Sequence, residues 1–207
     1  MSVWVTPYSD PVAGTGSFRE DMRAELHTRL LDAARDITTA QGWSSLTMSA
    51  VANRAGISRQ HVYNAIGTKR ELGDALVGRE TDAFVAVVRR HLQERPDDLV
   101  AGSVAAVAGA LEYGASNDLL KAVLSADDGG ADSLLPVLTV NPEVVLDRAV
   151  RAIAAELAPV HGDGPDLARY VDGLVRLVIS HATQPAGPVE VAMAQARWLA
   201  RGFLADA

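Results

Sequence analysis

Residues 46–63 read LTMSAVANRAGISRQHVY, and this stretch decides the fold. Thr47 and Ser58 have the short hydroxyl side chains that cap helix N-termini, so each is expected to begin a helix. Gly56 lies between the two helices, where it can adopt the positive φ of a sharp turn. The stretch therefore predicts a helix-turn-helix, with helices near 48–54 and 59–66.

The second of these helices is expected to bury Val62 and to expose Arg59, Gln60 and His61 near its start. Arg and Gln side chains make bidentate hydrogen bonds with guanine and adenine edges in the major groove. An exposed helix that begins with such residues is typical of a DNA recognition helix. A pair of helices with a polar outer face would show the same pattern, so this stretch alone leaves both interpretations open.

Charge is distributed unevenly along the chain. The net charge is −7, but residues 17–95 contain 12 Lys/Arg against 10 Asp/Glu, whereas residues 96–207 contain 7 against 15. No acidic residue occurs between Asp36 and Glu71, a polar segment that contains Arg54, Arg59, Lys69 and Arg70. A surface without carboxylates can approach a phosphate backbone without like-charge repulsion. The charge distribution therefore favours DNA binding by the N-terminal part.

Helical periodicity extends over most of the chain, and no segment alternates polar and apolar residues as a strand does. The sequence predicts an all-α protein of about nine helices. The first runs from about residue 19 to residue 41, and the fourth begins after Thr68, which forms a capping box with Glu71, and ends near Pro96. Later helices are expected at about 98–115, 117–126, 142–158, 166–184 and 189–205, with a helical turn at 133–138.

These elements divide the chain into three parts. Residues 1–18 mix Pro, Gly, Ser and Thr and are expected to form a flexible arm. Residues 19–67 form the helix-turn-helix module. Residues 68–207 form a larger helical body, and the helix at 68–95 joins it to the module.

Residues 63–72, YNAIGTKREL, extend the motif into a longer match. The segment 29–72 closely resembles the DNA-binding domain of the TetR family of transcriptional repressors. The residues that carry the resemblance are Ala33, Ala34, Gly42, Thr47, Val51, Ala52, Ala55, Gly56, Ile57, Ser58, Tyr63, Lys69 and Leu72. One departure is Ala65-Ile66, where the family usually has His-Phe, although Ile66 can still fill an apolar position.

The resemblance implies roles for individual side chains. Thr47, Tyr63 and Lys69 would contact phosphates, whereas the residues at the start of the recognition helix would read bases. From the residues alone, Tyr63 could instead be a packing aromatic and Lys69 an ordinary exposed lysine. A helix N-terminus disfavours a cation, so a nearby phosphate would explain that lysine. The complete predicted DNA-binding set is Thr47, Ser58, Arg59, Gln60, His61, Tyr63, Asn64 and Lys69.

The resemblance also implies a dimer, because in this family the last two helices pair with their symmetry mates. Here these helices lie at about 166–184 and 188–205. The predicted interface residues are Tyr170, Leu174, Leu177, Val191, Gln195, Trp198 and Leu199. The alternative for each position is that it faces the core of its own body.

A ligand pocket is expected among the helices between Pro96 and His181, where the glycine-rich helix at 98–115 could leave interior space. The candidate wall residues are Tyr113, Leu120, Leu124, Leu138, Val145, Arg148, Arg176 and His181. Each of them, taken singly, is also explained as a core or surface residue. The many aliphatic side chains favour an apolar effector over a charged one.

Several other classes of function lack support in the sequence. The chain has no cysteine, its five histidines show no metal-ligand spacing, and it contains no recognised catalytic or nucleotide-binding motif. We therefore expect no enzymatic activity, no cofactor and no metal. Residues 1–18 do not resemble a signal peptide, and the apolar stretch at 99–111 is too short to span a bilayer, so a cytoplasmic protein without a membrane partner is expected.

Together these features predict a homodimeric repressor that binds double-stranded DNA at a palindromic operator and is released by a small apolar effector. Three alternatives remain at this point. A helical ligand-binding protein or enzyme could carry a vestigial helix-turn-helix, and an activator would share the same motif. An architectural DNA-binding protein would need a basic body, whereas residues 96–207 are acidic.

Overall fold

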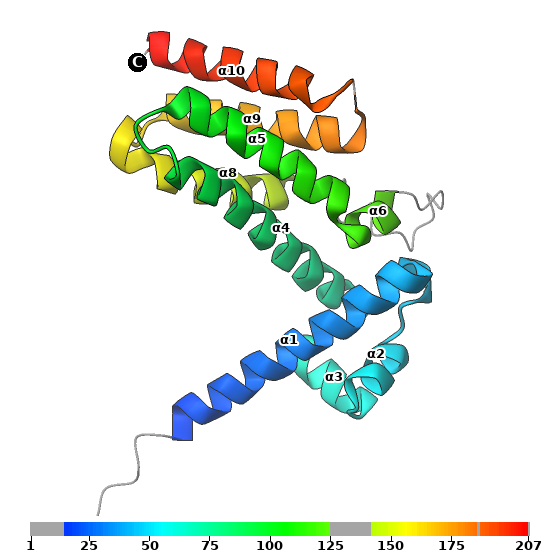
Figure 1. Cartoon of the computed structure of the whole chain (residues 1–207). Helices are drawn as coiled ribbons and strands as arrows, with labels where there is room; N and C mark the ends of the chain where they lie inside the picture. Colours follow the sequence, from blue (N-terminus) through cyan, green and yellow to red (C-terminus); the bar gives the residue numbers. More distant parts are fainter. Residues whose placement is uncertain (1–14, 125–141, 186, 207) are drawn as a thin grey trace, which may run out of the picture.

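A computed structural model describes residues 15–124, 142–185 and 187–206, and within these residues every regular element is a helix (Figure 1). This confirms the all-α prediction. The helices are α1 (Thr15–Gln41), the 3₁₀ helix η1 (Trp43–Ser45), α2 (Met48–Ala55), α3 (Arg59–Ile66), α4 (Lys69–Gln93), α5 (Leu99–Ser116), α6 (Asp118–Leu124), α8 (Pro142–His161), α9 (Pro165–Thr183) and α10 (Val189–Asp206).

The helices α1, α2 and α3 form a small N-terminal module around their own apolar core. The Thr47 hydroxyl accepts a hydrogen bond from the Ala50 N–H at 3.1 Å, and the Ser58 hydroxyl accepts one from the His61 N–H at 3.2 Å. Gly56 has φ 68° and ψ 33°, the left-handed conformation expected of the turn. The local chemistry of the motif therefore produces the helix-turn-helix.

The long helix α4 connects this module to the body. Thr68 and Glu71 form the predicted capping box at its start. Its first turns bury Leu72 and Leu76 in the core of the module, whereas Val88 and Leu92 near its end are buried in the core of the body. In Figure 1, α4 is the element that runs from the module into the layered helices of the body.

The body is built around α5, which contacts α4, α9 and α10. This helix has 18 residues, longer than the apolar stretch at 99–111, and its length and composition would allow it to cross a membrane. Its apolar face is nevertheless packed inside the body, with Val104, Val107 and Ala110 buried. The apolar composition of α5 is therefore explained by its position as a core helix, covered by the surrounding helices.

The structure differs from the prediction in two helix boundaries and in one additional short helix. Helix α1 begins at Thr15, so residues 15–18 belong to the helix and not to the arm. The 3₁₀ helix at Trp43–Ser45 was not predicted, because three residues are too few to show a helical period. Helix α8 continues through Pro159 to His161, because a proline in the last turn interrupts only one hydrogen bond near the helix end. Residues 1–14 and the predicted turn at 133–138 lie outside the described residues.

A buried hydroxyl pair connects α5 to α9. The Ser103 and Tyr170 hydroxyl groups are hydrogen-bonded to each other inside the body. Burial raises the pKa of Tyr170 to about 12, although the bond with Ser103 acts in the opposite direction. Both groups therefore remain protonated and hydrogen-bonded at neutral pH.

Removal of either hydroxyl alone, by Ser103→Ala or Tyr170→Phe, should lower the free energy of unfolding by about 1–3 kcal/mol, because the remaining hydroxyl stays buried without its partner. The double variant should cost clearly less than the sum of the two single changes. Urea unfolding of the four proteins at one protein concentration measures this difference. Additive effects would show that the two hydroxyls do not depend on each other.

Candidate DNA-binding surface and effector region

The exposed face of α3 carries two pairs of side chains, each spaced by one helical turn. The Arg59 Nη2 atom donates a hydrogen bond to the Tyr63 hydroxyl at 3.0 Å, and its guanidinium lies 5.3 Å from the centre of the Tyr63 ring. The Gln60 Nε2 atom donates to the Asn64 Oδ1 atom at 3.0 Å. Val62 is buried beneath them. The structure therefore brings four of the predicted DNA-binding residues together on one exposed surface.

Two further members of the predicted set also have structural roles. The Ser58 hydroxyl caps α3 and lies 2.8 Å from the Nδ1 atom of His61. The Thr47 hydroxyl caps α2. Each hydroxyl uses its oxygen as an acceptor in the cap, and an O–H can still serve as a donor. Capping and a phosphate contact are therefore compatible for Thr47, whereas the Ser58 O–H is available to a phosphate only in the tautomer in which His61 Nδ1 is the donor.

Lys69, at the start of α4, has an aromatic neighbour that sequence reasoning missed. Its Nζ atom lies 5.1 Å from the centre of the Trp43 ring. The indole is mostly buried and packs so closely on Gly73 that a Cβ there would lie 2.8 Å from the Trp43 Cη2 atom. The only hint of this contact in the sequence was an aromatic residue directly after Gly42, the residue that ends the first helix. Trp43 thus holds the lysine side chain against the module.

The segment without acidic residues is not free of carboxylates in space. Asp36 on α1 accepts hydrogen bonds from Arg54 at 2.6 and 3.1 Å, which pairs this cation with an acidic residue just before the segment. Arg70 lies 4.0 Å from Asp74 on its own helix. Arg59 and Lys69 lie over aromatic rings. At Arg54 and Arg70, a neighbouring carboxylate therefore offsets part of the positive charge that the sequence implied.

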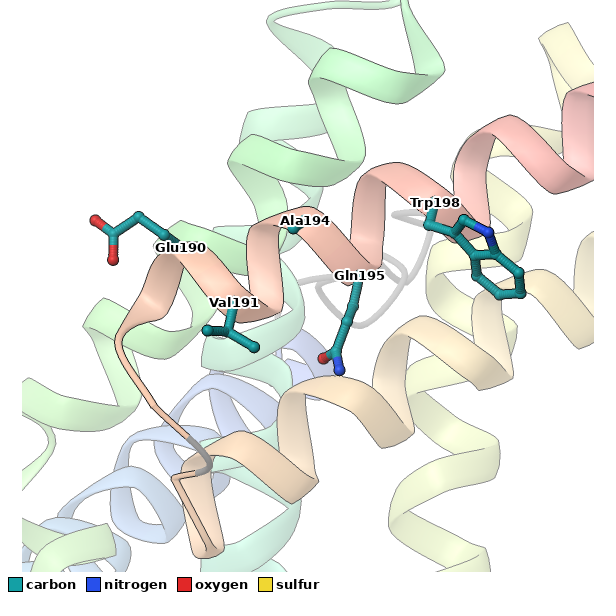
Figure 2. A pocket seen from close by; sticks show the side chains of 5 residues that line it. All are labelled: Glu190, Val191, Ala194, Gln195 and Trp198. Atoms are coloured by element: carbon teal, nitrogen blue, oxygen red, sulfur yellow. The ribbon is translucent and has the colours of Figure 1, made fainter.

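The predicted dimer residues separate into an exposed set and a buried set. Figure 2 shows one exposed face of α10, where a shallow hollow is lined by Glu190, Val191, Ala194, Gln195 and Trp198. Trp198 is 75% exposed, an unusual position for a tryptophan. Leu199 is half-buried, as is Leu177, which packs against the body core.

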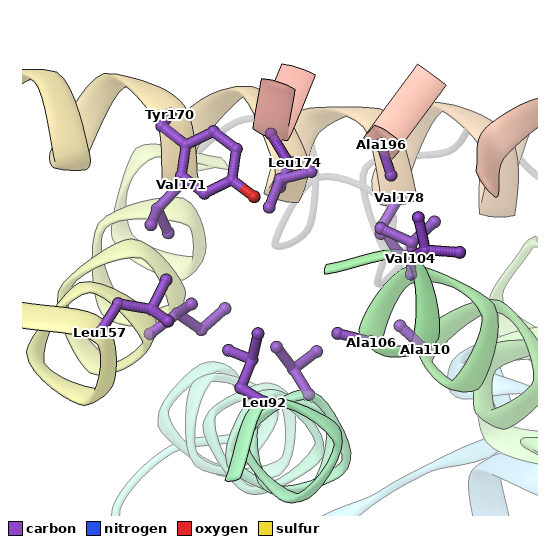
Figure 3. Close-up of a cluster of buried hydrophobic side chains, with 14 of the residues drawn as sticks. Leu92, Val104, Ala106, Ala110, Leu157, Tyr170, Val171, Leu174, Val178 and Ala196 are labelled. Atoms are coloured by element: carbon purple, nitrogen blue, oxygen red, sulfur yellow. The ribbon is translucent and has the colours of Figure 1, made fainter. Parts of the chain in front are cut away.

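Tyr170 and Leu174 do not belong to this exposed face. They are only 6% and 7% exposed, and they point into the core of their own body (Figure 3). Their placement in an interface is therefore wrong, because they have almost no surface left to bury. The broad apolar stripe of α9 faces inward, against α5 and α8, and the sequence period could not distinguish these two directions.

None of the predicted effector residues lines the hollow on α10 or the crevice between the ends of α4 and α8. Arg148 pairs with Asp82 on α4 at 2.7 Å, and Arg176 pairs with Asp172 at 2.7 Å, so both are surface residues. The buried His181 is hydrogen-bonded to Gln195 at 2.8 Å. Arg148 and Arg176 were placed wrongly because their long side chains reach acidic partners at the surface. The assignment of His181 to a pocket wall stays a prediction.

The other predicted effector residues have different positions. Tyr113 is half-buried with its ring edge-on to Phe84, at a centroid distance of 5.9 Å. Leu120 is half-buried near Gly114. Leu138 and the side chains of Leu124 and Val145 lie outside the described residues. Tyr113 and Leu120 lie near each other, since the side chain of Asn117 is hydrogen-bonded to the Tyr113 hydroxyl and to the Leu120 N–H.

Two family models match this chain, one in its N-terminal part and one in its C-terminal part. Residues 30–76 match the family model of bacterial regulatory proteins, TetR family, and residues 98–201 match that of the bacterial tetracyclin repressor C-terminal domain. The transcriptional regulator AlkX of Mycobacterium tuberculosis is 28% identical over 173 residues, which cover 81% of this chain and 80% of AlkX. The transcriptional activator FasR of Mycolicibacterium smegmatis is 31% identical over 88 residues, 42% of this chain and 40% of FasR.

A solved structure shows the same fold. The TetR-family repressor AlkX of a Dietzia strain, implicated in biodegradation of n-alkanes, superposes with a TM-score of 0.73 and 21% identity, over 86% of this chain and 95% of that one. The matched models cover both the helix-turn-helix and most of the body. The chain therefore belongs to the TetR family of DNA-binding transcriptional regulators, which are not enzymes.

Proposed function

We propose that this chain is a homodimeric repressor whose α3 helices read a palindromic operator and whose body releases DNA when a small apolar effector binds. The observation that carries the proposal is the exposed pairing of Arg59 with Tyr63 and of Gln60 with Asn64 on α3. These side chains match the hydrogen-bonding edges of guanine and adenine. Two-fold symmetry would place the half-sites about 34–36 Å apart, or a multiple of that distance.

Two kinds of DNA contact are expected from this surface. Arg59 and Gln60 lie at the start of α3, where a recognition helix meets base edges. Lys69 lies at the start of α4, held against Trp43, and is suited to a phosphate. Base contacts give sequence preference, whereas phosphate contacts give affinity that depends on salt.

The first functional prediction separates these roles. Lys69→Ala should weaken binding to the operator and to scrambled DNA about equally and should reduce the salt slope by about one unit per subunit. Arg59→Ala should cost about 1–3 kcal/mol on the operator and much less on scrambled DNA, because it removes a base contact. Fluorescence anisotropy at several salt concentrations measures both quantities.

Arg151→Ala is the matched control, because Arg151 is an exposed arginine of α8 that pairs with Asp147 within its own helix. It should leave both affinities unchanged. If Arg59→Ala preserved the ratio of specific to non-specific affinity while Lys69→Ala changed it, the proposed orientation of α3 on DNA would be wrong.

The exposed face of α10 supports a homodimer. Val191 and Trp198 are exposed apolar residues on this face, and Gln195 lies between them. A Cβ added at Gly202 would meet nothing within 4 Å, so a partner helix could approach closely there. A monomer would leave this large tryptophan in water, and a symmetric helix pair would bury it.

Trp198→Asp should convert the dimer into a monomer, because two symmetric carboxylates would be buried in an apolar interface. Sedimentation at micromolar concentration measures the change, and circular dichroism checks that the helices remain. Phe18→Asp is the control, since Phe18 is also exposed but lies on α1, away from α10. A wild type that sediments as a monomer would refute the proposed interface.

The ion pairs of α4 support effector-driven release. Arg79 binds Asp32 of α1 at 2.6 Å, and one turn later Asp82 binds Arg148 of α8. The same part of α4 is thus tied to the DNA-binding module and to the body. An effector that displaces α8 would move α4 and, with it, the module, and by linkage DNA would weaken effector binding by the same factor. The aliphatic body, together with a structural relative implicated in biodegradation of n-alkanes, favours an apolar effector.

An activator is the second candidate function. The support for it is the match to FasR, a transcriptional activator, over 42% of this chain. Transcription from a DNA fragment that carries the operator, with purified RNA polymerase and increasing amounts of the protein, distinguishes the two. A repressor lowers the transcript level, whereas an activator raises it.

A further inference from the structure

A crevice of about 290 Å³ lies at the end of the body remote from the DNA-binding module. It is formed where α4 ends, α5 begins and α8 ends. Its walls are mainly apolar and include Leu92, Pro96, Leu99, Leu157, Pro159 and Val160. None of the residues predicted to bind an effector lines it.

Two properties of these walls suit an apolar ligand. Pro96 and Pro159 are rigid, so the crevice is formed with little loss of conformational entropy when a ligand binds. Val160 at its rim is 58% exposed, which leaves a branched apolar side chain in water. A ligand that covered Val160 would remove that apolar surface from water, which favours binding.

The charges beside the crevice disfavour a charged ligand. Arg95 and Glu156 both line it, so an ion of either sign would meet a like charge. The Glu156 carboxylate is already occupied, since Gln93 donates to Oε1 at 2.7 Å and Arg89 donates to Oε2 at 2.8 Å. The hydrogen bond from Gln93, together with Arg89, lowers the pKa of Glu156 despite the opposing effect of burial, so this carboxylate stays ionised.

One polar group in the wall lacks a partner. The Nε2 atom of His161, a residue that lines the crevice, is closed to solvent and has no hydrogen bond within the described part of the chain, so a ligand reaches it only when the imidazole turns toward the crevice. The ring is oriented by Phe203 of α10, which it meets edge-on at a centroid distance of 6.4 Å. A buried polar atom without a hydrogen bond destabilises the protein, so a ligand that supplied the bond would recover part of this cost. A hydroxyl group suits either tautomer of the ring, because it can both donate and accept.

We propose that this crevice binds a small, uncharged aliphatic molecule with a terminal hydroxyl, whose chain lies against the apolar wall and whose hydroxyl bonds to His161. The crevice has about ten times the roughly 30 Å³ that a water molecule occupies in the liquid, which corresponds to about ten non-hydrogen atoms. Octan-1-ol has this size and chemistry and serves as the probe.

The use of this site as the effector site rests on the proposed function. The crevice includes the last turn of α4, and Glu156 ties α8 to that helix through Arg89 and Gln93. A ligand between the ends of α4 and α8 would displace the helix whose other end begins at Lys69. Binding in the crevice itself does not require DNA.

Isothermal titration of the full chain with octan-1-ol, without DNA, should show one site per chain. Val160→Trp should abolish binding, because the indole fills the crevice from an exposed rim position and does not disturb the core. Ala155→Trp is the matched control, as it places the same side chain at an exposed position of α8 outside the crevice, and it should bind as the wild type does.

His161→Phe keeps an aromatic ring against Phe203 but removes Nε2, so it should weaken octan-1-ol binding by about twofold to tenfold, the value of one hydrogen bond. His27→Phe on α1 should have no effect. Octanoate and octylamine should bind more weakly than the alcohol. Absence of binding, binding that survives Val160→Trp, or tighter binding of either charged analogue would overturn the proposal.

Operator affinity with and without octan-1-ol is measured separately. If octan-1-ol binds but operator affinity stays constant, the crevice is a binding site for the alcohol but is not the effector site. A chain that binds the alcohol but no promoter DNA would contradict the proposed function and leave the crevice proposal intact.

Discussion

The structure depends on one continuous helix that belongs to two cores. Helix α4 has 25 residues, which corresponds to a length of ~37 Å, and it contributes Leu72 and Leu76 to the module and Leu92 to the body. A helix is stiff along its axis, so neither end can tilt without moving the other. Its start is fixed by hydrogen bonds from the Thr68 N–H and hydroxyl to Glu71, which lower the pKa of that carboxyl and keep the cap ionised. The relative position of reading head and body therefore depends on the packing of α4.

Polar contacts at the middle of α4 connect it to its neighbours only weakly. Glu80 accepts hydrogen bonds from Arg35 of α1 at 3.1 Å and from Asn117, at the start of α6, at 2.8 Å. Ion pairs with this degree of exposure contribute only about 0–1 kcal/mol each. Their effect is on geometry more than on stability, because a rotated α4 would exchange these partners for water at little cost. A junction held by several weak contacts can adopt a second arrangement when a ligand provides a few kcal/mol.

The parts of the structure that the sequence could predict are those that depend on neighbouring residues. Local chemistry predicts the helix caps at Thr47, Ser58 and Thr68 and the left-handed conformation of Gly56. These features together predict the helix-turn-helix. Contacts between distant segments could not be predicted, because the residues next to each partner in the sequence do not identify the other partner. Nothing near Arg148 in the sequence indicates that its partner is Asp82, and the helical period of α9 does not show that Tyr170 meets Ser103 and not a second subunit. The crevice at His161 was missed for the same reason, since it exists only where the ends of three helices meet.

The two cations that we propose to contact DNA illustrate how such contacts could serve recognition. Long basic side chains lose about 0.5–1.5 kcal/mol of rotamer entropy each when an interface immobilises them. Arg59 over Tyr63 and Lys69 over Trp43 are already restrained in the unbound protein, so part of that loss has occurred before DNA arrives. An exposed cation–π contact is worth only about 0.5–1 kcal/mol, whereas a bidentate contact with the correct base discriminates by about 1–3 kcal/mol. The aromatic ring therefore holds each cation strongly enough to orient it and weakly enough to release it to a base or a phosphate.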